Sequence, residues 1–315
     1  MFLSEILPGS SALEMASREG PRTWTQCMEW PQKGFDSLQR FLKDEALHFA
    51  QCPSVVMTSS FSGVGTAEIA GHMGHQAFCQ GVGSAAKFCS YSCCDVDKHC
   101  QRLLSFQDHM RVFGSTTELF EDSVLSKLRA KIKAVKIKVR NDGYPLKHAG
   151  IEVCHFAFDL FKDQRPKTTS FCYRCNSHCQ RYPDDAFLSS TNSIWIDVSG
   201  SPCIPWTPAA YGNTEKWLHS SVTEAYMCWI FSLVNQGSRP PDVIVHENVS
   251  GFDYEGSYVF LQDLYTMESF IISPEDVGLP VARPRRPQSS KFKMTSMHRF
   301  KADDISVMWT KIQLL

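Results

Sequence analysis

The stretch SVVMTSSFSGVGTAEIAGHMG, residues 54–74, has the pattern of a β-strand, a glycine-containing turn and a helix. Gly63 and Gly65 allow a sharp turn after the strand and let a ligand approach the N-terminus of the following helix. A strand that passes through such a turn into a helix is the opening unit of an α/β fold. The stretch therefore predicts both the fold class and the place of a candidate ligand site.

The same order of elements recurs along the chain. KFCSYSCCDVDKHCQRLL (87–104) predicts a strand ending near Asp95 and then a helix. IWIDVSGSPC (194–203) predicts a third strand with its turn, TEAYMCWIFSLVNQG (223–237) a helix, and PDVIVHENVSGF (241–252) a fourth strand. Strands alternating with helices imply right-handed crossovers and a mainly parallel sheet with helices on both faces. Ligands gather at the carboxyl ends of such strands, so we expect these turns to form one site.

The composition narrows the class of protein. The formal net charge of −1 gives no global attraction to nucleic acid, so any polyanion must meet local basic patches. No apolar run is long enough to span a bilayer, and the first twenty residues lack the pattern of a secretory signal. Thirteen cysteines without an export signal indicate reduced thiols. We expect an intracellular protein of the nucleus or cytoplasm, neither secreted nor bound to a membrane.

Asp95 follows the second predicted strand, where an acid can accept hydrogen bonds from the two hydroxyls of a ribose. No Lys-Ser or Lys-Thr pair follows Gly63 and Gly65 to hold a triphosphate. These residues favour a nucleoside cofactor without phosphates.

Three further groups follow later strands. Cys203 lies in a tight turn after Pro202, either as a nucleophile or as a buried thiol. Glu247 ends an apolar strand, where it is either an acid with a raised pKa or an ion-paired carboxylate. Arg283 and Arg285 point the same way in an extended segment and can bind a carbonyl or phosphate, or they belong to an exposed basic turn.

In this order the motifs resemble those of the DNA (cytosine-5)-methyltransferase family, which uses S-adenosyl-L-methionine. The resemblance extends over roughly residues 54–290. The family has five motifs in this order: Phe-x-Gly-x-Gly, an acid after the second strand, Pro-Cys, Glu-Asn-Val and Gln-x-Arg-x-Arg. In this chain they read FSGVG, CCDVDK, SPC, ENV and VARPR. The resemblance implies a Rossmann-like class I methyltransferase fold. It also implies transfer of a methyl group to carbon 5 of a cytosine that is flipped out of duplex DNA.

The resemblance also implies roles for the catalytic residues. Cys203 would add to carbon 6 of cytosine and so make carbon 5 nucleophilic. Glu247 would hold the ring nitrogen and the exocyclic amine and offset the charge that develops. Arg285, helped by Arg283, would bind the carbonyl of the base.

For the cofactor, the resemblance places Phe61 by the adenine, Gly63 and Gly65 under the amino-acid end, and Asp95 on the ribose hydroxyls. Pro202 would form the wall near the sulfonium. Ser62 and Val96 lie within the same motifs and are included in this site. Ser115 would stand where the family has an adenine-binding acid. Asp159 in HFAFDLF, which follows a strand-like run of its own, is the alternative.

Several departures from the family keep other functions open. Ser59 and Ser60 replace the usual Asp-Leu, and Val281 replaces the glutamine of the arginine motif. Only thirty residues follow Arg285, too few for the usual target-recognition domain and the last helix of the family. The alternatives are methylation of cytosine in tRNA or other RNA, and an inactive or truncated relative that binds nucleic acid or a protein.

The resulting organisation has five parts. They are an N-terminal helical extension (1–52), a cofactor-binding half (53–115), a basic and cysteine-rich insertion (116–192), a catalytic half (193–290) and a short C-terminal tail (291–315).

The insertion carries two features with open interpretations. CYRCNSHC supplies Cys172, Cys175, His178 and Cys179, with Cys154 and His155 upstream. We assign no metal here, and the alternative is zinc on Cys172, Cys175 and Cys179. The run KLRAKIKAVKIKVR (127–140) has an apolar stripe that predicts a helix, formed by Leu128, Ile132, Val135 and Val139. Its basic residues either face solvent or contact the phosphates of nucleic acid.

Overall fold

The computed structural model describes residues 54–107, 111–207, 216–237, 239–253, 261–272 and 292–298. The expected N-terminal helical extension lies outside the described residues, and so do Val281, Arg283 and Arg285. Of the expected C-terminal tail, only Phe292–His298 is described, and it forms a strand of the main sheet.

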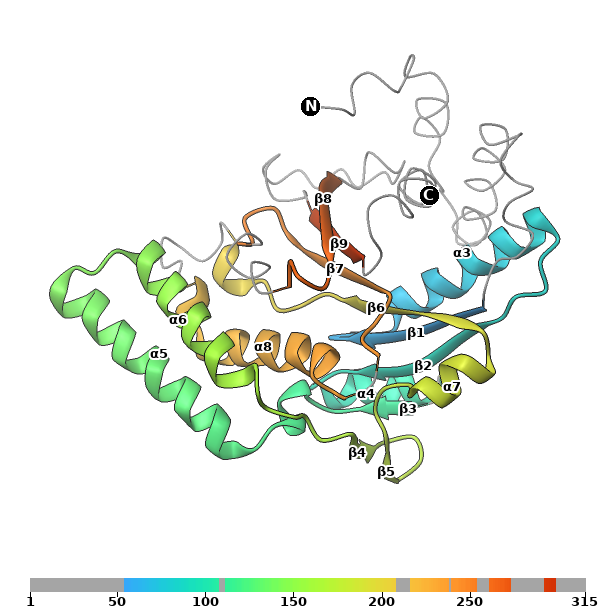
Figure 1. Cartoon of the computed structure of the whole chain (residues 1–315), viewed down its shortest axis with the longest axis horizontal. Coiled ribbons are helices and arrows are strands. Elements are labelled where there is room, and N and C mark those ends of the chain that lie inside the picture. Colours follow the sequence, from blue (N-terminus) through green and yellow to red (C-terminus); the bar gives the residue numbers. More distant parts are fainter. Residues whose placement is uncertain are drawn as a thin grey trace, which may run out of the picture.

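A seven-stranded sheet forms the centre of the protein (Figure 1). Its strands are β1 (Ser54–Ser60), β2 (Phe88–Cys94), β3 (Arg111–Phe113), β6 (Ser193–Ser199), β7 (Val243–Val249), β8 (Thr266–Ile272) and β9 (Phe292–His298). They lie in the order β3-β2-β1-β6-β7-β9-β8. The first five are parallel, whereas β9 runs antiparallel to both of its neighbours. Counted in chain order, the parallel strands have the 3-2-1-4-5 arrangement of dinucleotide-binding folds.

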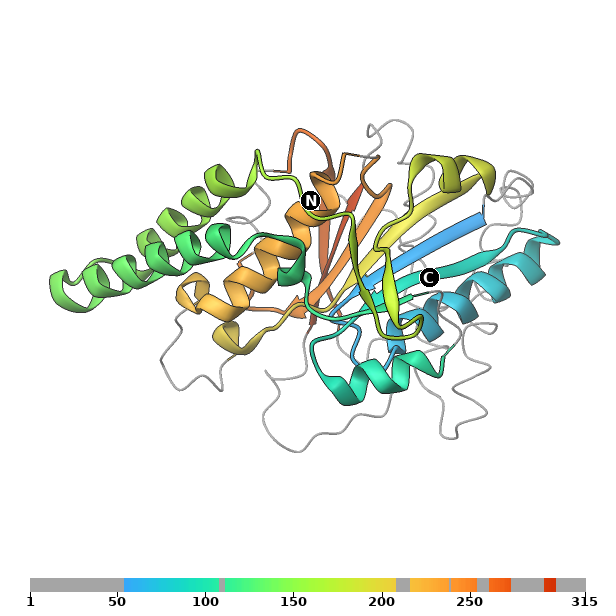
Figure 2. The same ribbon diagram turned by 90° about the horizontal axis from the view of Figure 1, so that it is seen from below.

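Helices cover both faces of this sheet (Figure 2). On one face lie α3 (Thr66–Val82) and α4 (Lys98–Ser105), and α3 approaches so closely that a Cβ on Gly71 would lie 2.9 Å from the sulfur of Met57. On the other face α8 (Ser220–Val234) packs over Val56 and Trp195. The side chains of a strand alternate between the faces, so β1 contributes to both layers. The predicted α/β fold, a mostly parallel sheet with helices on both faces, is confirmed, and its strand order is consistent with the expected Rossmann-like class I methyltransferase fold.

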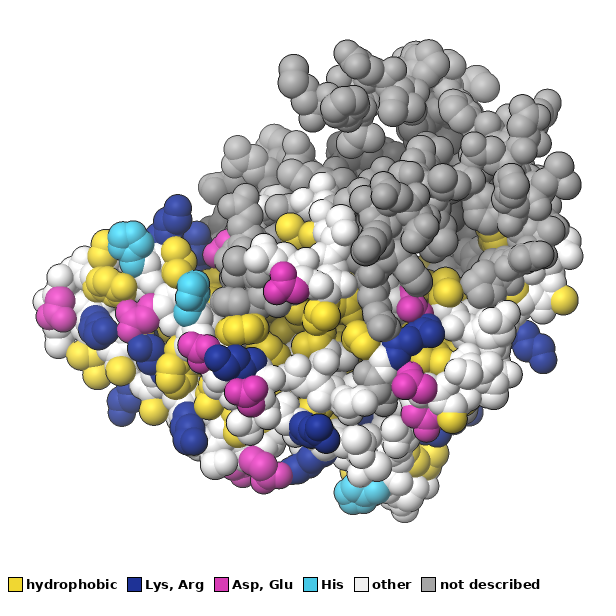
Figure 3. All heavy atoms as spheres, viewed as in Figure 1, with side chains coloured by type: hydrophobic (Ala, Val, Ile, Leu, Met, Phe, Trp, Pro, Cys, Tyr) yellow, Lys and Arg dark blue, Asp and Glu magenta, His cyan; other side chains and the backbone are white. Residues whose placement is uncertain are grey.

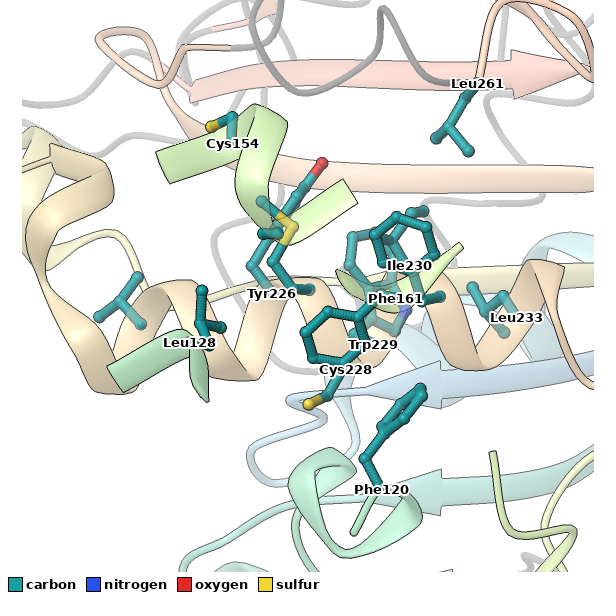
Figure 4. Close-up of a cluster of buried hydrophobic side chains, with 14 of the residues drawn as sticks. Phe120, Leu128, Cys154, Phe161, Tyr226, Cys228, Trp229, Ile230, Leu233 and Leu261 are labelled. Atoms are coloured by element: carbon teal, nitrogen blue, oxygen red, sulfur yellow. The ribbon is translucent and has the colours of Figure 1, made fainter. Parts of the chain in front are cut away.

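The core on the α8 face joins elements that are distant in sequence. Figure 4 shows Tyr226, Trp229 and Leu233 of α8 among side chains that include Leu128 and Phe161. These two come from α5 (Asp122–Asp142) and α6 (Leu146–Phe161), which form a helical hairpin at one end of the molecule (Figures 1 and 2). The expected insertion therefore shares its core with the sheet.

The helix predicted from the stripe in 127–140 is confirmed as part of α5, with Leu128, Ile132 and Val135 buried. The prediction of a strand before Asp159 is wrong, because these residues belong to α6. Buried residues recur there at the spacing of helical turns, as at Val153 and Ala157, and this burial decides in favour of a helix.

The remaining elements are short. They are the hairpin β4 (Thr169–Cys172) and β5 (Ser177–Gln180), α7 (Asp185–Ser190), and the 3₁₀ turns Thr116–Leu119, Ile204–Trp206 and Lys216–Leu218. Among the helices that the structure describes, none combines the length and apolar character needed to cross a membrane.

Candidate functional site

The strand order reverses between β1 and β6, which is where open α/β sheets bind ligands, beyond the carboxyl ends of the strands. The glycine turn follows β1, Asp95 follows β2, and the Pro-Cys turn follows β6. Glu247 lies near the end of β7. The topology therefore brings four of the five predicted motifs to one edge of the sheet, and the arginine motif lies outside the described residues.

Asp95 ties the glycine turn to the second strand. Its Oδ2 accepts a hydrogen bond from the backbone N–H of Gly63 at 2.9 Å, and its Oδ1 accepts one from the N–H of Asp97 at 2.8 Å. The hydroxyl of Ser62 accepts a hydrogen bond from the N–H of Cys94. Each carboxylate oxygen of Asp95 keeps a second lone pair, and the side chain is half-buried. Asp95 can therefore shape the turn and still accept hydrogen bonds from a ligand.

The turn itself requires unusual backbone geometry. Gly63 and Gly65 have φ values of +56° and +86°, and a Cβ at Gly65 would clash with Oε1 of Gln107. Phe61 also has positive φ, at 58°, although it carries a side chain. Its half-buried ring packs edge-on against Trp229, with ring centroids 6.4 Å apart.

Glu68 is a buried acid in the first turn of α3 that the sequence interpretation missed. One oxygen, Oε1, accepts a hydrogen bond from the hydroxyl of Ser59. Within the described residues the other oxygen, Oε2, has no hydrogen-bond partner. A buried acceptor without a partner is costly unless a ligand or water supplies a donor. Its only sequence signal is an acid three residues after Gly65.

The Cys203 turn is held by β7. The side-chain amide of Asn248 donates hydrogen bonds to the backbone oxygen of Ser201 at 3.1 Å and to its hydroxyl at 3.0 Å. The Ser201 hydroxyl also shares a hydrogen bond of 2.7 Å with Nε2 of His246. Cys203 is half-buried and accepts the N–H of Trp206 on its backbone oxygen, which closes a 3₁₀ turn. Because Ser201 is fixed, the position of Cys203 two residues later is restricted.

Glu247 lies on the side of β7 opposite the two residues that hold Ser201, because adjacent side chains of a strand alternate. A Cβ on Gly200 would lie 3.3 Å from Oε2 of Glu247, so the carboxylate lies close to this turn. Burial raises the pKa of the Glu247 carboxyl. Burial, and then the negative charge of Glu247, raise the pKa of the Cys203 thiol. The two predicted catalytic groups are therefore close enough to influence each other.

Asp197 lies beneath the site and was also missed, because nothing in its local pattern distinguishes it from an outward-facing strand residue. It is fully buried and accepts hydrogen bonds from the Thr58 hydroxyl at 2.6 Å and the Trp229 indole at 2.9 Å. Burial raises the pKa of Asp197 to about 7. This polar contact joins β1, β6 and α8 under the predicted cofactor and base sites.

The remaining predicted cofactor residues differ in accessibility. Pro202 is half-buried, and Val96 is exposed. The Ser115 hydroxyl already accepts the N–H of Thr117 at 3.1 Å and caps the 3₁₀ turn after β3. The rival of Ser115, Asp159, is exposed on α6 and forms an ion pair with Lys162.

Three of the basic side chains in 127–140 form ion pairs with acids of neighbouring helices. Arg129 makes a two-pronged contact with the buried Glu224 of α8, and both Lys131 and Lys138 contact Glu152 of α6. Figure 3 shows the Lys and Arg side chains of this end of the molecule intermixed with Asp, Glu and hydrophobic groups. The basic run is thus partly used in holding the helices together.

No family model matches the chain, and no curated protein matches it. Among solved structures, it is similar to a prophage-encoded protein from E. coli described as a DNA modification methyltransferase. The TM-score is 0.32 and the sequence identity 11%, over 80% of this chain and 50% of the other. The chain thus spans about half the length of that protein.

Proposed function

We propose that the protein transfers a methyl group from S-adenosyl-L-methionine to carbon 5 of cytosine in DNA, through a covalent bond between Cys203 and the base. The main support for the proposal is that Cys203 and Glu247 lie close together at the switch point of the sheet. The glycine turn, which Asp95 holds through the N–H of Gly63, follows the neighbouring strand at the same edge. A thiol, an acid with a raised pKa and a nucleoside-type turn are the groups that this chemistry requires.

The residues present fit the proposed cofactor. Asp95 offers acceptors for ribose hydroxyls, and the space around Gly63 is open where a side chain would stand. The buried Oε2 of Glu68 offers an acceptor to a cationic group such as the α-amino group of the cofactor. Phe61 offers an aromatic surface to the adenine. The cofactor, when bound, supplies a methyl group on a positively charged sulfur.

Glu247 and Cys203 would activate the base together. A protonated Glu247 donates a hydrogen bond to the ring nitrogen of cytosine, and its neutral form no longer opposes ionisation of Cys203. The Cys203 thiol would lose its proton to solvent, and the thiolate would add to carbon 6, so that an electron pair moves to carbon 5. Carbon 5 would then take the methyl group as the bond between this methyl and the sulfonium sulfur breaks, with its electron pair left on the sulfur. Loss of the proton from carbon 5 to water, with expulsion of the Cys203 thiolate from carbon 6, would restore the double bond of the ring. Arg283 and Arg285 would bind the base carbonyl.

The first experiment measures binding of S-adenosyl-L-methionine to the full-length chain by calorimetry. A hydrogen bond to a charged group contributes about 1.5–3 kcal/mol, so Asp95→Ala should weaken binding roughly 10–150-fold. Glu68→Gln should also weaken it, because the amide cannot neutralise a cation. Asp97→Asn is the matched control, since Asn keeps the cap of α4 and leaves the proposed site untouched. Absence of binding, or equal binding by all variants, would reject the cofactor site.

The second experiment traps the covalent bond to the base. A DNA duplex containing 5-fluorocytosine cannot lose fluorine from carbon 5, so the adduct should persist and map to Cys203 by mass spectrometry. Cys203→Ser should form none. Methyl transfer from labelled cofactor to RNA but not to DNA would favour the RNA alternative. Cofactor binding without transfer to either polymer would favour an inactive relative.

A further inference from the structure

Three cysteines converge on the β4–β5 hairpin. The sulfur atoms of Cys172, Cys175 and Cys179 all lie within 4.8 Å of one another. Cys172 ends β4, Cys175 lies in the connecting turn and Cys179 belongs to β5. Tetrahedral zinc with Zn–S bonds of about 2.3 Å separates its sulfur ligands by roughly 3.8 Å. The three thiols therefore need only a small adjustment to reach one ion.

The turn has backbone groups directed at the buried sulfur. The N–H groups of Val112 and Cys175 both donate to Sγ of Cys172 at 3.4 Å, and Cys172 is 0% exposed. Hydrogen bonds from backbone N–H groups favour the thiolate, which is the form of cysteine that binds metals. Cys175 is exposed and Cys179 half-buried, so an ion can reach the cluster from solvent.

We propose that Cys172, Cys175 and Cys179 bind one zinc ion, which fixes the β4–β5 hairpin against the edge of the sheet. Three thiolates select a soft or borderline ion such as zinc over magnesium or calcium. A disulfide would join only two of the sulfurs and leave the convergence of the third unexplained. Within the described residues no fourth ligand joins the group.

His178 is adjacent to Cys179 in sequence but is excluded as a ligand. Neighbouring residues of a strand point to opposite faces, so His178 faces away from the sulfurs. Its ring packs edge-on against Phe171, its partner across the hairpin, with ring centroids 6.1 Å apart. His178→Ala therefore provides a control, because it removes a histidine next to Cys179 and leaves the three sulfur ligands in place.

The hairpin is coupled to the glycine turn through a short series of contacts. The N–H of Tyr173 donates to the backbone oxygen of Val112, and the Arg174 guanidinium donates to that of Gln107 at 2.9 Å. The side-chain amide of Gln107 in turn donates to the backbone oxygen of Val64 at 2.6 Å. An ion that orders the hairpin would therefore stabilise both β3 and the turn that follows β1.

The test is the metal content of the full-length protein, purified under reducing conditions and measured by elemental mass spectrometry with and without added zinc. We expect about one zinc ion per chain, and cobalt substitution should give an intense thiolate-to-cobalt charge-transfer absorption. Cys175→Ser and Cys179→Ser should weaken zinc binding by more than the roughly 10–100-fold that loss of an outer-shell partner costs. His178→Ala and Cys89→Ser, which alters a half-buried thiol on β2, should retain it.

A chelator gives a second readout on the wild-type chain and does not depend on how the variants fold. It should lower the midpoint of thermal unfolding of wild type and of His178→Ala, and should leave Cys175→Ser unchanged. The proposal is overturned if wild type takes up no zinc, if the serine variants bind zinc as tightly as wild type, or if peptide mapping finds a disulfide among the three cysteines in the protein purified under reducing conditions. None of these readouts depends on methyl transfer, so this proposal can fail independently of the proposed function.

Discussion

Replacement of Ser201 by Ala tests how the Cys203 turn is held. The Ser201 hydroxyl is buried between His246 and Asn248 and bonds to both, at 2.7 and 3.0 Å. Its backbone oxygen keeps the second bond from Asn248 when the hydroxyl is removed. The substitution therefore removes two hydrogen bonds and leaves the backbone path in place.

The expected cost follows from the burial of His246. The ring is 0% exposed, and burial lowers its pKa to about 3, so the imidazole is neutral at ordinary pH. A buried polar group that loses its partner costs about 1–3 kcal/mol, and a lost neutral hydrogen bond about 1 kcal/mol. Ser201→Ala should therefore lower the free energy of unfolding by roughly 2–4 kcal/mol.

A double-mutant cycle with His246→Phe isolates the contact. The rings of Tyr226, Trp229 and Phe252 surround His246, with centroids 5.0 to 5.6 Å away, and provide an apolar lining for Phe. In the His246→Phe background, Ser201→Ala should cost only about 1 kcal/mol, because no buried nitrogen then loses its partner. Any overpacking by Phe is present both in the His246→Phe variant and in the double variant, so it cancels when the two are compared.

Urea unfolding, followed by tryptophan fluorescence, gives the four free energies. We expect a coupling energy of about 1–3 kcal/mol between the two positions. Strictly additive effects, with a coupling below about 0.5 kcal/mol, would refute the role of this hydrogen bond in holding the turn.

Three other predictions use the same kinds of measurement. Because the pKa of Asp197 is raised to about 7, the folded chain holds a proton there that the unfolded chain releases above about pH 4. The free energy of unfolding in urea should thus fall as the pH rises from about 4 to 7, and it should fall less in Asp197→Asn. An equal dependence on pH in wild type and variant would contradict the raised pKa of Asp197. Glu247→Gln should speed alkylation of Cys203 at about pH 8, measured by peptide mass spectrometry, because it removes the charge that raises the thiol pKa. An unchanged rate would argue against their proximity. Arg129→Ala should cost about 1–2 kcal/mol, since it leaves the buried Glu224 without its ion pair; a cost near zero would show that the exposed guanidinium contributes little.

The local pattern predicted the strands and turns of the candidate site well. Around Gly63 and Cys203, a strand-like run is followed by a turn with glycine or proline, and at Asp95 a strand-like run is followed directly by the start of a helix. Alternation of strands and helices then restricts the sheet to parallel pairing, so the convergence of these turns follows from topology. The same local logic failed at Asp159, because an apolar run fits either a strand or a buried helix until its packing partners are known.

The sequence by itself determined four of the parallel strands with their turns, the fold class and the carboxyl-end position of Cys203 and Glu247, since these depend on neighbours along the chain. Only the tertiary structure revealed the buried Asp197, the Glu68 oxygen that lacks a hydrogen-bond partner among the described residues, and the antiparallel β9 between β7 and β8. The hydrogen bond of Thr58 to Asp197 joins residues 139 positions apart, and that of Ser201 with His246 joins residues 45 apart. Such contacts form only when the sheet has assembled, and burial there gives an ordinary acid or histidine its altered pKa.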